Sequence, residues 1–209
     1  MNLANLLIGV PTTLLALTVH EFAHGYVSSK LGDPTPKFEG RLTLNPLAHL
    51  DLVGTLLMIF TGFGWAKPVM INPRYYKDQT KGMALTALAG PLANLILAFL
   101  GVVIWYIIAR VCVAMGNVGS LNMLTDIMYY FAGRNLCFAV FNIIPIPPLD
   151  GFKIAGVLFP KKFYYTVLRY ERYSILLIML LSLTGAFDLI IGTGVYGLLN
   201  LMIRLVTLF

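Results

Sequence analysis

The residues best suited to chemistry stand together near the start of the chain, in the run His20-Glu21-Phe22-Ala23-His24. Two histidines at positions i and i+4 share one face of a helix, so both imidazoles can reach one metal ion. Neutral imidazole is a good zinc ligand, and a carboxylate next to the first ligand can act as a general base in hydrolysis. These ionisable groups follow the nearly continuous apolar run 3–19. Because such groups are costly in membrane helices, we interpret them as functional rather than incidental.

A third metal ligand is expected, because catalytic zinc sites usually take three protein ligands. Asp150 is the favoured candidate, since it follows Pro145-Ile146-Pro147-Pro148 at the end of a predicted membrane helix. These prolines cannot continue a helix, and irregular backbone at membrane depth is tolerated only inside protein or beside a cavity. A solvated loop is the alternative interpretation of Asp150. Asp126 and Asp188 are predicted to lie at the far ends of their spans, and His49 is interpreted as a packing residue rather than a fourth ligand.

The elements that position these side chains are predicted to lie in a membrane. Of the 209 residues, 58% are hydrophobic and 11% are charged, whereas soluble domains contain about 45–50% apolar and about 25% charged residues. A soluble fold of this size has too little interior for so much apolar surface. This composition excludes an ordinary cytosolic enzyme and a disordered chain. The dispersed basic residues exclude nucleic acid as a partner.

The hydropathy pattern predicts an all-α multi-pass membrane protein with about five to six membrane helices, forming a single domain over residues 1–209. A re-entrant segment and a small β-hairpin or sheet at the cytoplasmic face complete the predicted fold. The expected elements are a helix over 3–29, a hairpin over 37–44, a re-entrant segment over 52–66, and spans over 83–114, 121–144, 173–191 and 195–209. No cleaved signal peptide is expected, because the N-terminus has no basic region. Cys112 and Cys137 are expected to be reduced.

The basic residues predict the orientation of the helices. In the predicted topology, segments on one side carry 12 of the 15 basic residues: Lys30, Lys37, Arg41, Lys67, Arg74, Lys77, Lys81, Lys153, Lys161, Lys162, Arg169 and Arg172. Lys and Arg favour the cytoplasmic side. The N-terminus is therefore predicted outside, the C-terminus inside, and the site near the cytoplasmic leaflet.

The ordered set of motifs resembles the site-2 protease family of intramembrane zinc metalloproteases. The resemblance covers nearly the whole chain and rests on the histidine motif, on Leu44–Asp51, Gly62–Val69 and Ala89–Asn94, and on Asn142–Gly151. It is closest to the compact branch of the family that lacks PDZ and CBS domains. The resemblance implies that His20, His24 and Asp150 hold one zinc ion per chain and that Glu21 is the catalytic base.

The resemblance also implies roles that spacing alone does not. Asn142 is expected near the zinc, as a hydrogen-bond donor to the oxyanion or as a residue that ends its helix. Asn94 is expected either to face the cavity and bind substrate or to bond backbone freed by Pro91. Gly62 and Gly64 are expected either to let an unwound substrate pair with an exposed strand edge or to belong to an interfacial anchor.

The predicted function is an intramembrane zinc metalloendopeptidase that cuts peptide bonds within or near transmembrane segments, in a prokaryotic cell membrane. Its predicted partners are the lipid bilayer, membrane protein or peptide substrates, and a regulatory membrane protein or a second copy of the chain. Two alternatives remain at this point. A zinc transporter would need a site open to both faces, and a catalytically silent helix-binding protein would not need Glu21, His20, His24 and Asp150 intact.

Overall fold

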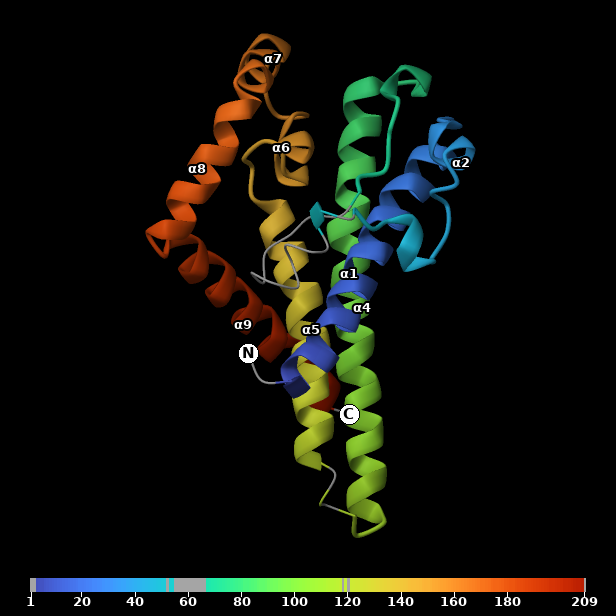
Figure 1. The fold of residues 1–209 in the computed structure, drawn as a ribbon, viewed down its shortest axis with the longest axis vertical. Coiled ribbons are helices and arrows are strands. Elements are labelled where there is room, and N and C mark those ends of the chain that lie inside the picture. Colours follow the sequence, from blue (N-terminus) through green and yellow to red (C-terminus); the bar gives the residue numbers. More distant parts are fainter. Residues whose placement is uncertain (1–2, 52, 55–66, 118, 120, 209) are drawn as a thin grey trace.

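The computed structural model describes residues 3–51, 53–54, 67–117, 119 and 121–208. Three long helices pack together at its centre: α1 (Leu3–Lys30), α4 (Gln79–Ala114) and α5 (Leu121–Ile143). In Figure 1, α4 and α5 run side by side along the long axis and α1 crosses them obliquely. The last helix, α9 (Ala186–Thr207), packs against α5 and α4.

Short elements gather around the upper half of these helices in Figure 1. They are α2 (Thr35–Phe38), η1 (Pro46–Ala48), η2 (Pro73–Tyr75), α6 (Asp150–Ala155) and α7 (Lys161–Arg169), from which α8 (Glu171–Leu183) leads back towards α9. The two 3-10 turns begin alike, because in each an asparagine precedes a proline. The Asn45 and Asn72 side chains accept from the backbone two residues on, and the proline needs no hydrogen-bond acceptor at the first helical position.

Helix α4 begins at a side-chain cap and continues through a proline. The Asp78 carboxylate accepts from the Lys81 amide, which satisfies one of the free N–H groups of the first turn. Pro91, inside the predicted span 83–114, does not end the helix, which runs for 36 residues. At about 1.5 Å per residue its length is about 54 Å, whereas a membrane's hydrocarbon core is about 30 Å thick. Helix α4 is therefore long enough to cross a bilayer and extend beyond it.

The apolar core lies between α4, α5 and α9, at the end away from the short elements. Its buried members are Ala98 and Val102 from α4, Met128, Ala132 and Leu136 from α5, and Leu199, Met202 and Val206 from α9. On α5 the core residues recur every four positions, as a helical contact stripe requires. We call this cluster the apolar core below.

The predicted number of five to six membrane helices is wrong for the described residues. Two helices, α4 and α9, are long and apolar enough to cross a membrane by length and composition. Helices α1 and α5 are not among them, and both carry polar residues, including His20, His24 and Asn135. The residues that make the site thus lower the hydropathy that a count of spans relies on.

The predicted hairpin or sheet at the basic end is also wrong. Residues 35–38 form α2, a turn follows at Glu39-Gly40, and no strand longer than the single bridge residue Leu50 occurs in the described part of the chain. Gly40 adopts a positive φ of 66°, which favours a turn over continued strand. The predicted re-entrant segment 52–66, with Gly62 and Gly64, lies outside the described residues except for 53–54.

The C-terminal helices also differ from the prediction. The break falls at Gly185, with a φ of 72°, and residues 192–194 lie inside α9. Residues 173–183 belong to α8, whose 13 residues are too few for a span of about 20. Phe187 packs on Phe141 near the end of α5, while Val206 joins Met128 in the apolar core. Helix α9 therefore runs away from the short elements. Asp188, in the first turn of α9, lies at the end of the bundle near the short elements and not at the opposite end, where it was predicted.

Candidate metal centre

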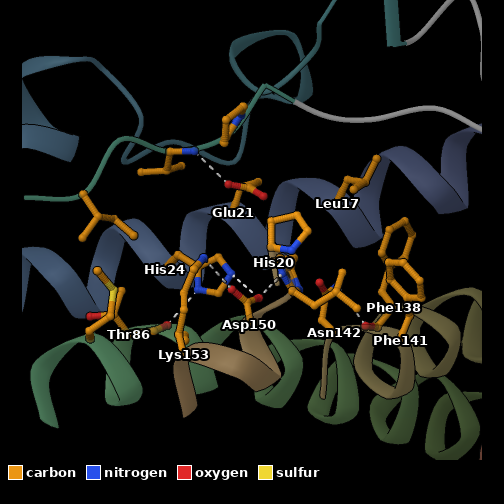
Figure 2. A pocket seen from close by; sticks show the side chains of 17 residues that line it. Leu17, His20, Glu21, His24, Thr86, Phe138, Phe141, Asn142, Asp150 and Lys153 are labelled. Atoms are coloured by element: carbon orange, nitrogen blue, oxygen red, sulfur yellow. Dashed lines mark hydrogen bonds and ion pairs between the residues drawn. The ribbon is translucent and has the colours of Figure 1, made fainter. Parts of the chain in front are cut away.

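A cavity of about 350 Å³ opens between α1, α4, α5, α6 and the extended segment 67–72. Figure 2 shows the side chains of α1 that face Asp150 across it. Its walls are apolar on several sides and polar where the histidines lie. The lining residues are Leu17, His20, Glu21, His24, Pro68, Val69, Ile71, Met83, Thr86, Ala87, Phe138, Phe141, Asn142, Pro148, Leu149, Asp150 and Lys153.

Three metal-ligand atoms converge in this cavity, one each from His20, His24 and Asp150. Oδ2 of Asp150 lies 3.1 Å from Nε2 of His20 and 3.0 Å from Nε2 of His24. All three residues are buried, and their ligand atoms lie within 4.8 Å of one another. The structure thus joins residues that are 130 positions apart in the chain.

The second ring nitrogen of each histidine is held from behind. Nδ1 of His24 lies 2.7 Å from the backbone oxygen of Thr86. That oxygen only accepts, so Nδ1 carries the hydrogen and Nε2 is free to bind a metal. Nδ1 of His20 lies 2.7 Å from Oδ1 of Asn94. A hydrogen-bond partner on the second nitrogen is the usual arrangement for metal-binding histidines.

The donor set fits a zinc ion. Zinc takes nitrogen and carboxylate oxygen at about 2.0–2.2 Å in tetrahedral sites, which separates two ligand atoms by about 3.4 Å. The two nitrogen–oxygen distances of 3.1 and 3.0 Å are close to that separation. Because Gly90 has no side chain, the backbone of α4 can lie close to both imidazole rings. A Cβ at this position would lie 2.5 Å from Nε2 of His24 and 2.6 Å from Cε1 of His20.

Asp150 is positioned by a sharp return of the chain after α5. Residues 144–149 fold back over the end of that helix, and Asp150 begins α6. Gly151 permits this return, because a Cβ there would collide with the carbonyl oxygen of Ile143. Oδ1 of Asp150 accepts from Nζ of Lys153 at 3.2 Å.

Glu21 lies on the opposite side of the cavity from α4 and is half-buried. Its Oε2 accepts from the Val69 backbone amide at 2.9 Å, as the upper part of Figure 2 shows. This bond ties segment 67–72 to α1 beside the histidines. Glu21 lines the cavity together with His20, His24 and Asp150, which places a carboxylate beside the convergent ligands.

Of the other residues considered in the sequence, one lines the cavity and two are buried outside it. Asn142 lines the cavity, and its Nδ2 donates to the Phe138 carbonyl of its own helix. Asn94 is fully buried behind His20 and is not among the lining residues. His49 is buried outside the cavity, with Nε2 at 2.8 Å from the Thr43 carbonyl oxygen. Gly62 and Gly64 lie outside the described residues.

Sequence reasoning missed three residues that shape the site: Thr86, Asn135 and Lys153. Thr86 acts through its backbone oxygen, so its side chain gives no signal. Asn135 is fully buried in an apolar helix and bonds Asn94; its polar side chain within an apolar run was an available signal. Lys153 stands three residues after Asp150, the spacing of a same-face helical pair.

Comparison with curated proteins finds relatives over most of the chain. A stretch of 175 residues, 84% of this chain, is 38% identical to "Putative zinc metalloprotease YwhC" of Bacillus subtilis and covers 80% of that protein. "Putative zinc metalloprotease Rip2" of Mycolicibacterium smegmatis is 30% identical over 147 residues, which cover 66% of this chain and 52% of that protein. Rip2 of Mycobacterium tuberculosis H37Rv is 29% identical over 143 residues.

No family model and no solved structure matches the chain. The chain spans about half the length of the Rip2 proteins, with 52% coverage, but most of YwhC, with 80%. Identity of 38% to YwhC, together with the histidine motif and the later aspartate, decides the classification. The chain belongs to the site-2 protease family of intramembrane zinc metalloproteases.

Proposed function

We propose that this chain is a zinc endopeptidase that hydrolyses peptide bonds within or near the transmembrane segments of other proteins. The convergence of His20, His24 and Asp150 beside Glu21 carries the proposal. Membership of a family of zinc metalloproteases supports it. His20 and His24 would hold zinc through Nε2, and Asp150 through Oδ2.

Bound zinc would supply a Lewis acid that polarises the substrate carbonyl and favours ionisation of water. Glu21 would accept a proton from the attacking water and later deliver it to the leaving amine. The Val69 amide holds one oxygen of Glu21 at 2.9 Å and so fixes the orientation of the carboxylate. Lys153 holds the second oxygen of Asp150, which leaves Oδ2 for the metal. Asn142, on the cavity wall, would donate a hydrogen bond to the developing oxyanion.

The cavity favours an apolar peptide as substrate. Leu17, Phe138 and Phe141 form an apolar wall beside the ligands. A volume of about 350 Å³ lies within the range of about 300–1,000 Å³ that is usual for ligand sites. We propose that a segment of a membrane protein enters in extended form, because the peptide bonds of a helix are covered by its own turns. The basic residues at the site end, Lys153 among them, favour a site near the cytoplasmic leaflet.

The test compares wild type with Glu21→Gln, using Glu39→Gln as the matched control because Glu39 lies outside this cavity. Each protein is purified in detergent, its zinc is measured by mass spectrometry, and cleavage of a membrane-helix substrate is followed. We expect all three to bind one zinc ion, and Glu21→Gln to lose cleavage by about 10²–10⁴-fold. Undiminished cleavage by Glu21→Gln would show that Glu21 is not the general base. Zinc binding without cleavage by wild type, with zinc flux in vesicles, would replace the protease by a transporter.

A further inference from the structure

Two buried amides stand behind the candidate metal centre, in a line that leads from α5 to His20. Asn94 on α4 and Asn135 on α5 are both fully buried. Nδ2 of Asn94 donates to Oδ1 of Asn135 at 3.0 Å, and Oδ1 of Asn94 lies 2.7 Å from Nδ1 of His20. Neither asparagine lines the cavity. Any effect that they have on the site therefore passes through α1, where Asn94 contacts His20 and Ala16.

The direction of every hydrogen bond in this line is fixed by backbone carbonyls, which only accept. Nδ2 of Asn135 donates to the Phe131 carbonyl at 2.9 Å, so Oδ1 of Asn135 must face Asn94. Nδ2 of Asn94 donates to the Ala16 carbonyl at 3.0 Å as well as to Asn135. Both hydrogens of the Asn94 amide are thereby used, and its oxygen must face His20.

The chemical consequence falls on the imidazole of His20. An oxygen at 2.7 Å from Nδ1 accepts a hydrogen, so Nδ1 is protonated and the lone pair lies on Nε2. Nε2 is the nitrogen that lies 3.1 Å from Oδ2 of Asp150. The Ala16 contact joins the same amide to the helical turn that precedes His20. We call Asn94 and Asn135, with the hydrogen bonds that join them to His20, the relay. The relay therefore sets both the tautomer and the orientation of the His20 ring.

We propose that Asn94 and Asn135 are positioning residues that fix His20 as an Nε2 zinc ligand, rather than residues that contact substrate. The proposal rests on the proposed function, because it assumes that zinc binds at His20. His24 needs no such relay, since the Thr86 backbone oxygen already fixes its tautomer. Losing the relay therefore weakens one ligand of three.

The test measures zinc affinity, by competition with a chelator, and the visible spectrum of the Co²⁺-substituted protein. Asn135→Leu keeps a side chain of similar size but removes both hydrogen bonds of the Asn135 amide, to Asn94 and to the Phe131 carbonyl. Asn135→Asp, when its buried carboxyl is protonated, can still accept from Asn94 and donate to the Phe131 carbonyl. Thr18→Val is the control, because Thr18 is buried on α1 but bonds only the Leu14 carbonyl.

We expect Asn135→Leu to weaken zinc binding by about 10–100-fold and to change the Co²⁺ spectrum. We expect Asn135→Asp to stay much closer to wild type and Thr18→Val to match it. Wild-type affinity in Asn135→Leu, or an equal loss in Thr18→Val, would overturn the relay and leave the proposed function standing. A wild type that binds no zinc would overturn both.

A measurement on the unaltered protein covers the case in which Asn135→Leu does not fold. Nitrogen NMR of the zinc-loaded, ¹⁵N-histidine-labelled wild type reports which ring nitrogen carries hydrogen. We expect hydrogen on Nδ1 of His20 and zinc on Nε2. Zinc on Nδ1 would overturn the relay, because an acceptor oxygen at Asn94 cannot coexist with that tautomer.

Discussion

The two ends of the α4–α5 pair are built on different principles. At the site end, the fully buried side chains Thr86, Asn94 and Asn135 are polar, and each has a hydrogen-bond partner. At the far end, the fully buried side chains of the apolar core, such as Val102 and Ala132, have only packing contacts. Asn94 and Ala98, one turn apart on α4, mark the change.

The difference suggests that the polar end orients the histidine side chains, whereas the apolar end holds the helices together. Hydrogen bonds are directional, so the polar end fixes the orientation of His20 and His24. Packing is not directional, and apolar cores tolerate changes that keep shape and volume. The far end should therefore tolerate substitutions with a loss of stability alone, whereas the site end should lose metal binding before it loses its fold. Two glycines of α4 offer the sharpest test.

The largest effect is expected from Gly90→Ala. The added Cβ would lie 2.5 Å from Nε2 of His24 and 2.6 Å from Cε1 of His20, so it would displace both rings. We expect zinc affinity to fall by about 100-fold or more, measured by chelator competition. Alanine favours a helix by about 1 kcal/mol over glycine, so the metal-free variant should melt near the temperature of the metal-free wild type.

Gly101→Ala is the matched control in the same helix. Its added Cβ would meet the Phe131 ring, 2.5 Å from Cδ1 and 2.8 Å from Cε1, and a ring edge can shift. We expect zinc affinity to stay at the wild-type value and stability to change by about 1–3 kcal/mol at most. Equal zinc loss in both variants would show that the two ends are not independent.

A smaller effect, confined to stability, is expected from Met128→Ala. Met128 is buried in the apolar core, and its truncation leaves a cavity that costs about 2–5 kcal/mol. The measurement is unfolding of the metal-free protein in detergent, because bound zinc would add its own stabilisation. Zinc affinity should remain at the wild-type value. A loss of affinity comparable with that of Gly90→Ala would contradict the division between the ends.

The sequence predicted the candidate ligands better than the fold around them. The histidine motif depends only on helical spacing, so His20, Glu21 and His24 needed no tertiary information. The membrane count failed because α8 has 13 residues, too few for a span, and because α1 and α5 were counted as spans despite their polar residues. Hydropathy also could not reveal the break at Gly185, since the residues on both sides of it are equally apolar.

The support behind each histidine was also hidden, for a physical reason. The partner of His24 is the backbone oxygen of Thr86, and every residue carries such an oxygen. The partner of His20 is Asn94. From the sequence, it was equally reasonable that the Asn94 side chain bonds a backbone group left unpaired by Pro91. Only the packing of α4 against α1 decides between these two, and that packing depends on Gly90 and on the turn of α1 at Ala16.

The smallest expected effect is a pH dependence at the outer edge of the site end. The buried carboxylate of Asp33 accepts from Ser28 Oγ and from the amides of Thr35 and Asn72. Burial alone would raise the pKa of Asp33, but these hydrogen bonds outweigh it and lower that pKa. Ser28 and Tyr76 continue this network to Thr86, whose backbone oxygen holds His24.

A lowered folded-state pKa gives Asp33 a stabilising contribution that is present above its unfolded pKa of about 3.9. The contribution is lost as the pH falls from there through the folded pKa. We expect Asp33→Asn to melt below wild type at pH 7, with a gap that narrows below about pH 4. Asp188→Asn, at an exposed carboxylate, should keep a constant difference. Other titrating groups are common to all three proteins and cancel in the comparison, so a gap that stays constant to pH 3 would contradict the role of Asp33.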